Sequence, residues 1–256
     1  MIASLTVLGS GTSMGVPTIG CACEVCRSGD PHDKRLRPSI LLKYADKAVL
    51  VDTTPDFRTQ ALREGLTQVD AVLYTHAHAD HILGLDDLRP LSFHHAGKIP
   101  LYAGKDAAAL IKKMFSYIFD GNYKFGGLAQ VELNVIDRPL DLFGARFEPV
   151  KVMHGEAEIF GYRFGSGAYL TDFSSIPEES FAQLQDLDVL FLDALRHTPH
   201  PTHSTIENSL KIVNRLEPRR AFFTHIAHDL PHETTNVTLP PNVQLCYDGM
   251  KLDFEI

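Results

Sequence analysis

The segment His76-Ala77-His78-Ala79-Asp80-His81 places three imidazole rings and one carboxylate within six consecutive residues. His76 and His78 are two positions apart, so an extended backbone directs both rings to the same side. Asp80 and His81 follow as the chain turns, and the alanines are too small to crowd a site. Imidazoles combined with a carboxylate suit Zn²⁺, Mn²⁺ or Fe better than Ca²⁺ or Mg²⁺. The segment therefore predicts a metal site rather than a helix cap, because a cap needs only one such residue.

Residues of the kind that bind metals also follow apolar runs of strand length elsewhere in the chain. The residues that directly follow such runs are Asp52, His154, Asp172 and His225. Because binding and catalytic residues usually lie on loops held by a rigid scaffold, we expect these positions to contribute to one site. For Asp172 taken alone, a turn or a helix cap is an equally good interpretation.

The composition is that of an ordinary globular protein. The 256 residues are 44% hydrophobic and 22% charged, and 24 Lys and Arg against 32 Asp and Glu give a net charge of −8. A net acidic chain is a poor candidate for binding nucleic acid or an anionic membrane surface. No apolar run approaches the roughly 20 residues that a membrane-spanning helix needs, and the N-terminus does not resemble a secretory signal. We therefore expect a cytoplasmic protein with no membrane partner.

No repeat, low-complexity tract or linker interrupts the chain, so we expect a single domain over residues 1–256. Helical spacing predicts helices over Pro55–Arg63, Ala107–Phe119 and Ser204–Leu216. Apolar runs predict strands over Leu5–Leu8, Ile40–Tyr44, Ala48–Val51, Ala71–Tyr74, Pro100–Tyr102, Val131–Val135, Arg146–Val152, Phe160–Phe164, Tyr169–Leu170, Val189–Leu192, Ala221–Phe223 and Val243–Cys246. Such strands mixed with helices favour two packed sheets with helices outside.

Three of the four cysteines, Cys21, Cys23 and Cys26, lie in a turn-rich loop at about residues 20–27. In a chain of this type, such clustering indicates a metal rather than a disulfide. The C-x-C-x-x-C spacing supplies three thiols and needs a fourth ligand to complete a tetrahedral zinc site. The residues alone leave four candidates for this ligand, although Cys246 lies in a strand-like run that favours core packing. The candidates are His32, His228, His232 and Cys246.

The H-x-H-x-D-H segment after an apolar strand resembles the signature of the metallo-β-lactamase-fold hydrolases. The resemblance extends from Leu5 to Tyr247, because Asp52, His154, Asp172 and His225 occur in the order that this family shows. It implies an α/β (α+β) fold, a four-layer αββα sandwich of two mixed β-sheets flanked by helices. It also implies that the metal ions lie at one edge of the sandwich.

The same resemblance implies a site for two divalent metal ions, Zn or Mn. The first ion would be held by His76, His78 and His154, and the second by Asp80, His81 and His225, with Asp172 bridging both. Asp52 would orient a ligand histidine or metal-bound water, and Asp80 would count with Asp52 among the catalytic residues. Seven ligands are too many for one tetrahedral ion but suit two ions that share a carboxylate.

Two further features resemble the phosphodiesterase branch of this family, which includes tRNase Z. One is the turn Gly9-Ser10-Gly11-Thr12-Ser13 after the first strand, although an ordinary structural turn is its default interpretation. The other is His203-Ser204-Thr205, where a histidine would face the scissile phosphate and protonate the leaving alkoxide. His197 and His200 compete with His203 for this role. The resemblance makes His200 and Ser13 candidate substrate-binding residues.

The cysteine cluster resembles the phosphoribosyl 1,2-cyclic phosphate phosphodiesterases of the bacterial phosphonate (carbon–phosphorus lyase) pathway. These enzymes carry an extra structural zinc, and the resemblance makes His228 its fourth ligand, beside Cys21, Cys23 and Cys26. The chain departs from that pattern in its greater content of His and Pro over 197–203. The departure leaves the natural substrate open, and with it a place in phosphonate metabolism.

These features predict a phosphodiesterase that hydrolyses a small diester, a cyclic ribose or nucleoside phosphate, by attack of a metal-bridging hydroxide. One alternative is a tRNase Z-like endoribonuclease, which needs a basic or glycine-rich arm to grip RNA. The segment 121–127 is too short and too weakly basic for such an arm, so nucleic acid is not the expected partner. A non-catalytic metal protein and a hydrolase of another ester class are further alternatives, and a homodimer is left open.

Overall fold

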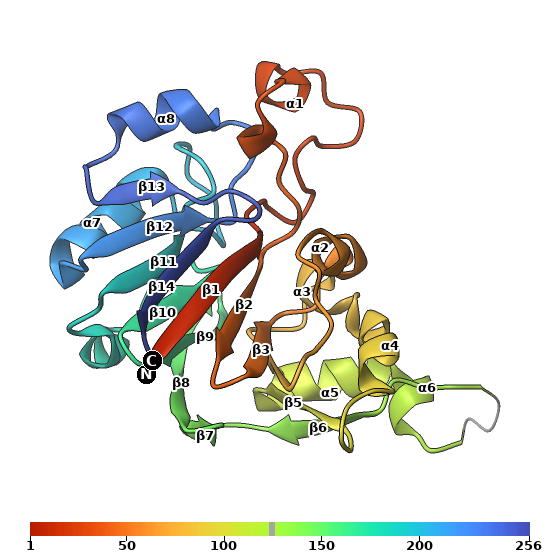
Figure 1. Ribbon diagram of the computed structural model, residues 1–256. Helices are drawn as coiled ribbons and strands as arrows, with labels where there is room; N and C mark the ends of the chain where they lie inside the picture. Colours follow the sequence, from red (N-terminus) through yellow and green to blue (C-terminus); the bar gives the residue numbers. More distant parts are fainter. Residues whose placement is uncertain (123–125) are drawn as a thin grey trace.

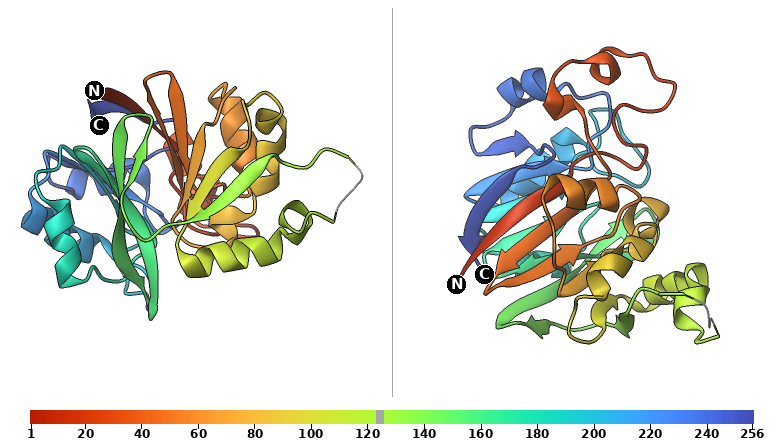
Figure 2. Two further views of the ribbon diagram at one scale, coloured as in Figure 1. Left: turned by 90° about the horizontal axis from the view of Figure 1, so that it is seen from below. Right: turned by 45° about the vertical axis from the view of Figure 1, so that its right-hand side comes forward.

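The computed structural model describes residues 1–122 and 126–256 and has four layers, two β-sheets face to face between two layers of helices (Figures 1 and 2). The predicted αββα sandwich is confirmed. The first sheet has the strand order β14-β1-β2-β3-β4-β5-β6, and the second has the order β13-β12-β11-β10-β9-β8-β7. The strands are β1 (Ile2–Gly9), β2 (Ser39–Tyr44), β3 (Lys47–Val51), β4 (Ala71–Tyr74), β5 (Ile99–Ala103), β6 (Val131–Val135), β7 (Leu140–Leu142), β8 (Ala145–His154), β9 (Ala157–Phe164), β10 (Gly167–Leu170), β11 (Val189–Asp193), β12 (Arg220–Thr224), β13 (Val243–Leu245) and β14 (Lys251–Glu255).

Both sheets are mixed in the same way. The pairs from β14 to β3 and from β7 to β10 are antiparallel, whereas the pairs from β3 to β6 and from β10 to β13 are parallel. Loops that follow the carboxyl ends of neighbouring parallel strands meet at one edge of a sheet, and ligands bind there in α/β proteins. The residues after β3, β4, β10, β11 and β12 are therefore placed to converge.

Strands buried on both faces explain the continuous apolar runs in the sequence. In β1, Leu5 and Val7 pack between the two sheets, whereas Leu8 packs against the outer helices of the first sheet. Phe147 of β8 and Phe191 of β11 pack into this core from the second sheet. The left view of Figure 2 shows helices outside both sheets.

The helices are α1 (Glu24–Arg27), α2 (Phe57–Arg63), α3 (Ala79–Ile82), α4 (Arg89–Ser92), α5 (Lys105–Met114), α6 (Ser116–Phe119), α7 (Ile206–Leu216) and α8 (His232–Thr238), with 3₁₀ turns η1 (Pro31–Asp33), η2 (Leu85–Leu88) and η3 (Glu178–Leu184). All three predicted helices have wrong bounds. The first helix begins at Phe57 rather than Pro55, and the second is broken at Phe115, whose φ of −109° and ψ of 37° are not helical. The third helix, α7, begins at Ile206 rather than Ser204, and Thr205 caps it by accepting a hydrogen bond from Asn208 N.

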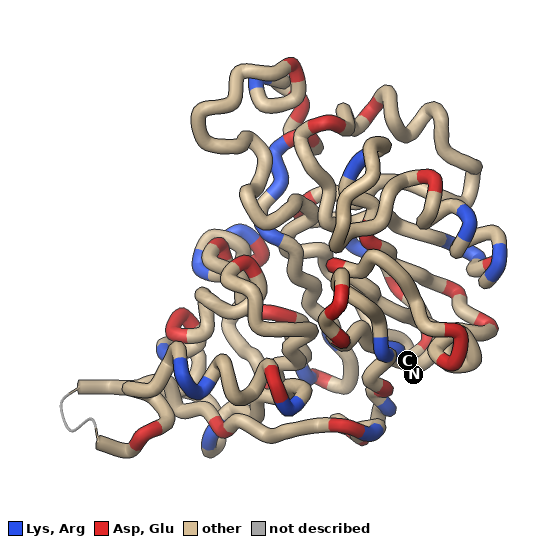
Figure 3. Tube along the Cα trace, turned by 180° about the vertical axis from the view of Figure 1, so that it is seen from behind, with Lys and Arg blue, Asp and Glu red and all other residues tan. Residues whose placement is uncertain are grey.

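Charged residues of both signs are interspersed along the chain trace (Figure 3). Residues 123–125 of the segment 121–127, discussed above as too short for an RNA-gripping arm, lie outside the described residues. Over 1–122 and 126–256, none of the helices is long and apolar enough to cross a bilayer.

Candidate active site

All seven predicted metal ligands lie together in two groups at the strand ends. The ligand atoms of His76, His78 and His154 lie within 4.8 Å of one another, and so do those of a second group. Asp172 belongs to the second group and also lies within 4.8 Å of a ligand atom of His154, so it sits between the two groups. The second group consists of Asp80, His81, Asp172 and His225.

The histidine rings of the first group face one another. His76 Nε2 lies 2.9 Å from His78 Nδ1. Burial, followed by the nearby His81, holds the pKa of His76 well below its usual value, so its ring is neutral. His154 Nδ1–H donates to the carbonyl oxygen of Asp172 at 2.6 Å, which leaves Nε2 of His154 as the ligand nitrogen. The group therefore offers lone pairs that suit a cation.

Asp52 orients His81 from the side away from the ligand groups. His81 Nδ1–H donates to Asp52 Oδ2 at 2.7 Å, and Asp52 also accepts from Thr75 N at 2.9 Å and Thr75 Oγ1 at 2.8 Å. This arrangement fixes the ring so that Nε2 of His81 lies 3.1 Å from Asp80 Oδ2 and 3.2 Å from Asp172 Oδ1. Asp52 thus contacts a ligand residue, as expected of an orienting group.

The second group concentrates negative charge that requires a cation. Burial would lower the pKa of His225, but Asp172 and Asp80 raise it to about 10, and the same carboxylates raise the pKa of His81 well above its usual value. A field that favours a proton here also favours a divalent ion. Within the described residues, Asp80 Oδ2, His81 Nε2 and both ring nitrogens of His225 are buried without a hydrogen-bond partner. These oxygen and nitrogen atoms, which lack hydrogen-bond partners, suit coordination of a divalent metal ion.

Three residues of the site adopt left-handed backbone conformations. Asp52 has a φ of 64°, Asp172 of 58° and His225 of 58°, and each directly follows or nearly follows a strand. Such conformations cost about 1–3 kcal/mol for residues other than glycine and persist where the surrounding structure holds them. At these three positions the strands turn polar side chains toward the two ligand groups.

His203 lies beside both ligand groups and is held by a residue that the sequence interpretation missed. Its Nδ1 lies 2.7 Å from Asp193 Oδ2, and its ring centroid lies 4.5 Å from that of His225 and 4.9 Å from that of His154. Burial raises the pKa of Asp193, although its bond to His203 opposes the shift. Asp193 ends the apolar run of β11, so the strand-end pattern that identified the other residues also marks this one.

The structure separates the two histidines that compete with His203. The ring centroid of His200 lies 5.0 Å from that of His203, so His200 borders the site. Burial, followed by His203, lowers the pKa of His200. His197 instead pairs with Glu207 at 2.7 Å on the exposed surface.

The glycine-rich turn at residues 9–13 uses its backbone donors within the protein. Ser10 N donates to Asp248 Oδ1 at 2.9 Å, Gly11 N to Leu36 O at 2.8 Å, and Thr12 N to Ile226 O at 3.0 Å. A Cβ at Gly9 would lie 1.9 Å from the carbonyl oxygen of Arg37, so close chain approach requires glycine there. Ser13 is exposed, and its carbonyl accepts from Arg37 Nε at 3.2 Å. The turn braces the residue after His225, and Ser13 stays outside the ligand groups described above.

Of the four candidates for the fourth ligand of the cysteine cluster, the structure brings His228 to the thiols. His228 Nδ1 lies 3.2 Å from Cys21 Sγ, 3.4 Å from Cys23 Sγ and 3.5 Å from Cys26 Sγ. Two ligands of a tetrahedral zinc ion are about 3.5 Å apart for ordinary Zn–S and Zn–N bonds. The N–H of Cys26, together with the neighbouring thiols and His228, lowers the pKa of Cys23 to about 6.

The remaining candidates lie elsewhere. His32 packs against the rings of His232 and Tyr247, with centroid distances of 4.6 and 4.2 Å. Cys246 is fully buried in the core between the sheets, as predicted. The cluster joins the loop that carries α1 to the segment between β12 and α8, at the top of Figure 1.

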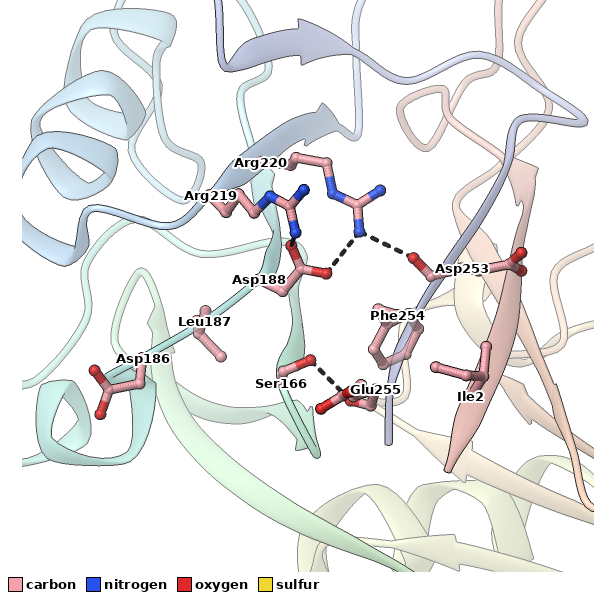
Figure 4. A pocket seen from close by; sticks show the side chains of 10 residues that line it. All are labelled: Ile2, Ser166, Asp186, Leu187, Asp188, Arg219, Arg220, Asp253, Phe254 and Glu255. Atoms are coloured by element: carbon pink, nitrogen blue, oxygen red, sulfur yellow. Dashed lines mark hydrogen bonds and ion pairs between the residues drawn. The ribbon is translucent and has the colours of Figure 1, made fainter.

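A separate cavity of about 580 Å³ lies at the opposite ends of the strands (Figure 4). Asp188 and Arg220 line it at the amino ends of β11 and β12, whereas Asp193 and His225 follow the carboxyl ends of the same strands. Its two arginines, Arg219 and Arg220, both pair with Asp188, at 3.8 and 2.7 Å. The cavity therefore holds none of the groups that make the histidine and aspartate cluster chemically distinctive.

Comparisons with known proteins agree with the fold. A family model described as "Beta-lactamase superfamily domain" matches residues 47–226. A solved structure, "Crystal Structure of a New Diphosphatase from the PhnP Family", has 60% sequence identity and a TM-score of 0.94, and the match covers 99% of this chain and 98% of that one.

Two curated relatives are longer than this chain. The octanoyltransferase of Porphyromonas gingivalis is 39% identical over 250 residues, 96% of this chain and 50% of that protein. The ribonuclease Z of Bradyrhizobium diazoefficiens is 25% identical over 147 residues, 54% of this chain and 47% of that protein. The matches thus span about half the length of these relatives. With its family match, its four-layer sandwich and its strand-end ligand groups, the chain belongs to the beta-lactamase superfamily and is similar within it to the PhnP family.

Proposed function

We propose that this chain hydrolyses a small phosphodiester, a cyclic ribose or nucleoside phosphate, to a phosphomonoester. The observation that carries the proposal is the Asp193–His203 pair, which lies against two groups of residues suited to divalent metal ions. A metal site alone fits many hydrolases, but an oriented histidine beside it fits expulsion of a poor alkoxide leaving group.

The grouping of the ligand atoms indicates which residues would hold each of the two ions. His76, His78 and His154 would hold one ion, and Asp80, His81 and His225 the other, with Asp172 between them. When bound, two Zn²⁺ or Mn²⁺ ions would supply an activated water as the nucleophile and stabilise the charge that develops on the phosphoryl oxygens. Asp52 would keep the His81 ring in place through its bond to Nδ1.

The protein's own proton chemistry falls to His203. Asp193 accepts from Nδ1–H, so Nε2 is the ring nitrogen that can carry a second proton toward the substrate. As the phosphorus–oxygen bond to the leaving group breaks, the alkoxide takes this proton from Nε2. Asp193, fully buried, fixes the ring and stabilises its positive charge beforehand.

A diphosphate linkage is the second candidate substrate, because the 60% identical relative is described as a diphosphatase. The same groups would serve, but a phosphate leaving group needs less protonation than an alkoxide. An RNA substrate has less support, since the chain carries a net charge of −8 and its basic residues are interspersed with acidic ones.

The cysteine cluster is proposed to hold one structural zinc, separate from catalysis. Its ligands, Cys21, Cys23, Cys26 and His228, leave no open position on a tetrahedral ion. The ion would fix the loop that follows His225.

The test is hydrolysis by protein loaded with Mn²⁺ or Zn²⁺, its metal content measured by elemental analysis. The substrates are bis(4-nitrophenyl) phosphate, a ribose 1,2-cyclic phosphate, a 2′,3′-cyclic nucleotide and a nucleoside diphosphate sugar. We expect turnover of a diester, and loss of turnover in Asp172→Ala excludes a contaminating enzyme. Turnover of the diphosphate alone would favour the second candidate. Fully loaded protein that hydrolyses none of them would contradict the proposal.

A further inference from the structure

A cavity of about 830 Å³ opens directly from the first ligand group. His76, His78 and His154 line one end of it, and the remainder extends between α5 and the β8–β9 hairpin. Its volume is in the range of cavities that bury most of a small ligand. We call it the side pocket, with walls that include Gly104, Lys105, Leu110, Val135, Ile136 and Phe160.

Part of the wall of the side pocket is apolar, formed by Leu110, Val135 and Phe160. Leu110 is 49% exposed and Val135 57% exposed, which is unusual for two large apolar side chains lining one cavity. Phe160 is half-buried, and its backbone N–H donates to Thr75 O at 3.1 Å, immediately before His76. This bond fixes the aromatic wall relative to the first ligand group.

Gly104 keeps the Phe160 ring uncovered. A Cβ at Gly104 would lie 3.0 Å from Phe160 Cε2, so any larger residue would press on the ring. Gly104 is also the N-cap of α5, a helix of ten residues, so the first backbone N–H groups of that helix have no partner within it. One end of the pocket thus combines an aromatic surface with hydrogen-bond donors.

The charges around the side pocket disfavour a second anion. Lys105 and Lys151 are the basic lining residues, and Lys151 is already paired with Glu158 at 3.1 Å. The acidic lining residues are more numerous: Asp106, Asp137, Glu156 and Glu158. A polyphosphate tail or a nucleic-acid backbone would be repelled here, whereas an uncharged group would not.

We propose that the side pocket binds an uncharged heteroaromatic ring of the substrate, a nucleobase, so that the substrate is a nucleoside ester rather than a bare sugar phosphate. The inference rests on the proposed function and extends it. A nucleobase presents flat apolar faces that suit Phe160, Leu110 and Val135, and polar edges that suit the helix donors and nearby carboxylates. A saturated acyl chain has no polar edge to match these groups.

The experiment compares two substrates with the same charge and the same leaving group. Thymidine 5′-(4-nitrophenyl phosphate) carries a base, and methyl 4-nitrophenyl phosphate does not. For metal-loaded protein, we expect a KM at least about tenfold lower for the thymidine ester. Leu110→Asp and Phe160→Ala should each raise that KM about tenfold or more, while kcat/KM for the methyl ester stays within about twofold.

The matched control is Leu62→Asp, since Leu62 is 66% exposed on α2 and does not line the side pocket. It should leave both substrates unaffected. Equal KM values for the two esters in the unmodified protein would overturn the inference, as would equal losses on both esters in Leu110→Asp. If neither ester is hydrolysed, the proposed function is judged by turnover of the cyclic phosphates instead. The pocket is then judged by binding of thymidine 5′-monophosphate, which Leu110→Asp must weaken relative to Leu62→Asp for the inference to stand.

Discussion

Asp193 Oδ2 lies 2.7 Å from Nδ1 of His203, and the carboxylate is fully buried beneath the ring. A buried carboxylate bonded to Nδ1 selects the tautomer of a histidine and strengthens its positive form. The pair resembles in geometry a second one at the surface, His197 with Glu207, also at 2.7 Å. Only the Asp193–His203 pair lies beside the ligand groups, so the His197–Glu207 pair serves as its control.

Asp193→Asn should lower kcat by about 10–10² on a diester with an alkoxide leaving group, because the ring of His203 loses its fixed tautomer. KM and metal content should change little. A purely structural role would lower kcat equally on alkyl and 4-nitrophenyl esters, whereas loss of the oriented His203 ring should lower it more on the alkyl ester. Glu207→Gln, which alters the matched surface pair, should leave kcat unchanged, and an equal effect in both variants would contradict the assignment.

His203→Ala should lower turnover by about 10²–10⁴ with both metal ions retained. The loss should shrink for a 4-nitrophenyl ester, because that leaving group departs without protonation. Steady-state kinetics on paired alkyl and nitrophenyl esters measure the difference. Equal losses on both esters would indicate a binding role, and a larger effect of His200→Ala would move the role to His200.

Asp172→Ala should lose at least one metal ion and nearly all activity, because Asp172 lies between the two ligand groups. Elemental analysis and turnover measure the result. Asp186→Ala is the matched control, since Asp186 also has a left-handed backbone, with a φ of 56°, but lies in the separate cavity at the other strand ends. Normal metal content and turnover in Asp172→Ala would show the ligand set to be wrong.

The sandwich and the candidate ligand residues could be predicted because short motifs of the sequence resemble those of the metallo-β-lactamase-fold hydrolases. His76, His78 and His81 lie in one short segment, and each distant ligand directly follows an apolar run. The helical spacing of apolar residues predicts one helix running through Phe115, but the backbone of Phe115 is not helical. Periodicity reports which residues can share a face, and it does not report where the backbone turns.

The partners of these residues could not be predicted, because they depend on contacts between distant segments. Asp193 and His203 meet only when β11 and the loop before α7 are both in place. The residues alone leave His228 and His32 both open as the fourth cysteine-cluster ligand, and the family resemblance is needed to predict His228, because the choice depends on where the loop before α8 lies. The side pocket has no local signal at all, since Leu110 and Phe160 are 50 positions apart in the sequence.

Cys23→Ser should release one tightly held zinc ion and lower stability and solubility before it affects catalysis. The three sulfurs surround His228 Nδ1 at 3.2–3.5 Å, so loss of one opens the site. Cys246→Ser is the matched control, because that thiol is buried in the core outside the cluster and its loss should leave the zinc content unchanged. Native protein that holds only two metal ions, with its clustered thiols freely reactive, would refute the structural site.

His232 should make the free energy of unfolding depend on pH between about 4 and 6.5. Burial, followed by the charges of His32 and Arg35, lowers the pKa of His232 to about 4, whereas Asp30 and Asp33 oppose the shift weakly. Between these pH values His232 is protonated in the unfolded chain but neutral in the folded protein. The free energy of unfolding therefore falls as the pH falls.

His232→Phe keeps a ring against His32 and Tyr247 and removes the titrating group. Urea unfolding at pH 7 and pH 5 should therefore show a smaller loss of stability for the variant than for the unmodified protein, by at most about 1.4 kcal/mol per pH unit. His94→Phe, at an exposed position, should lose as much stability as the unmodified protein. Because zinc release at low pH affects all three proteins alike, it cancels in the comparison, and parallel pH profiles for all three would show that His232 titrates as it does in the unfolded chain.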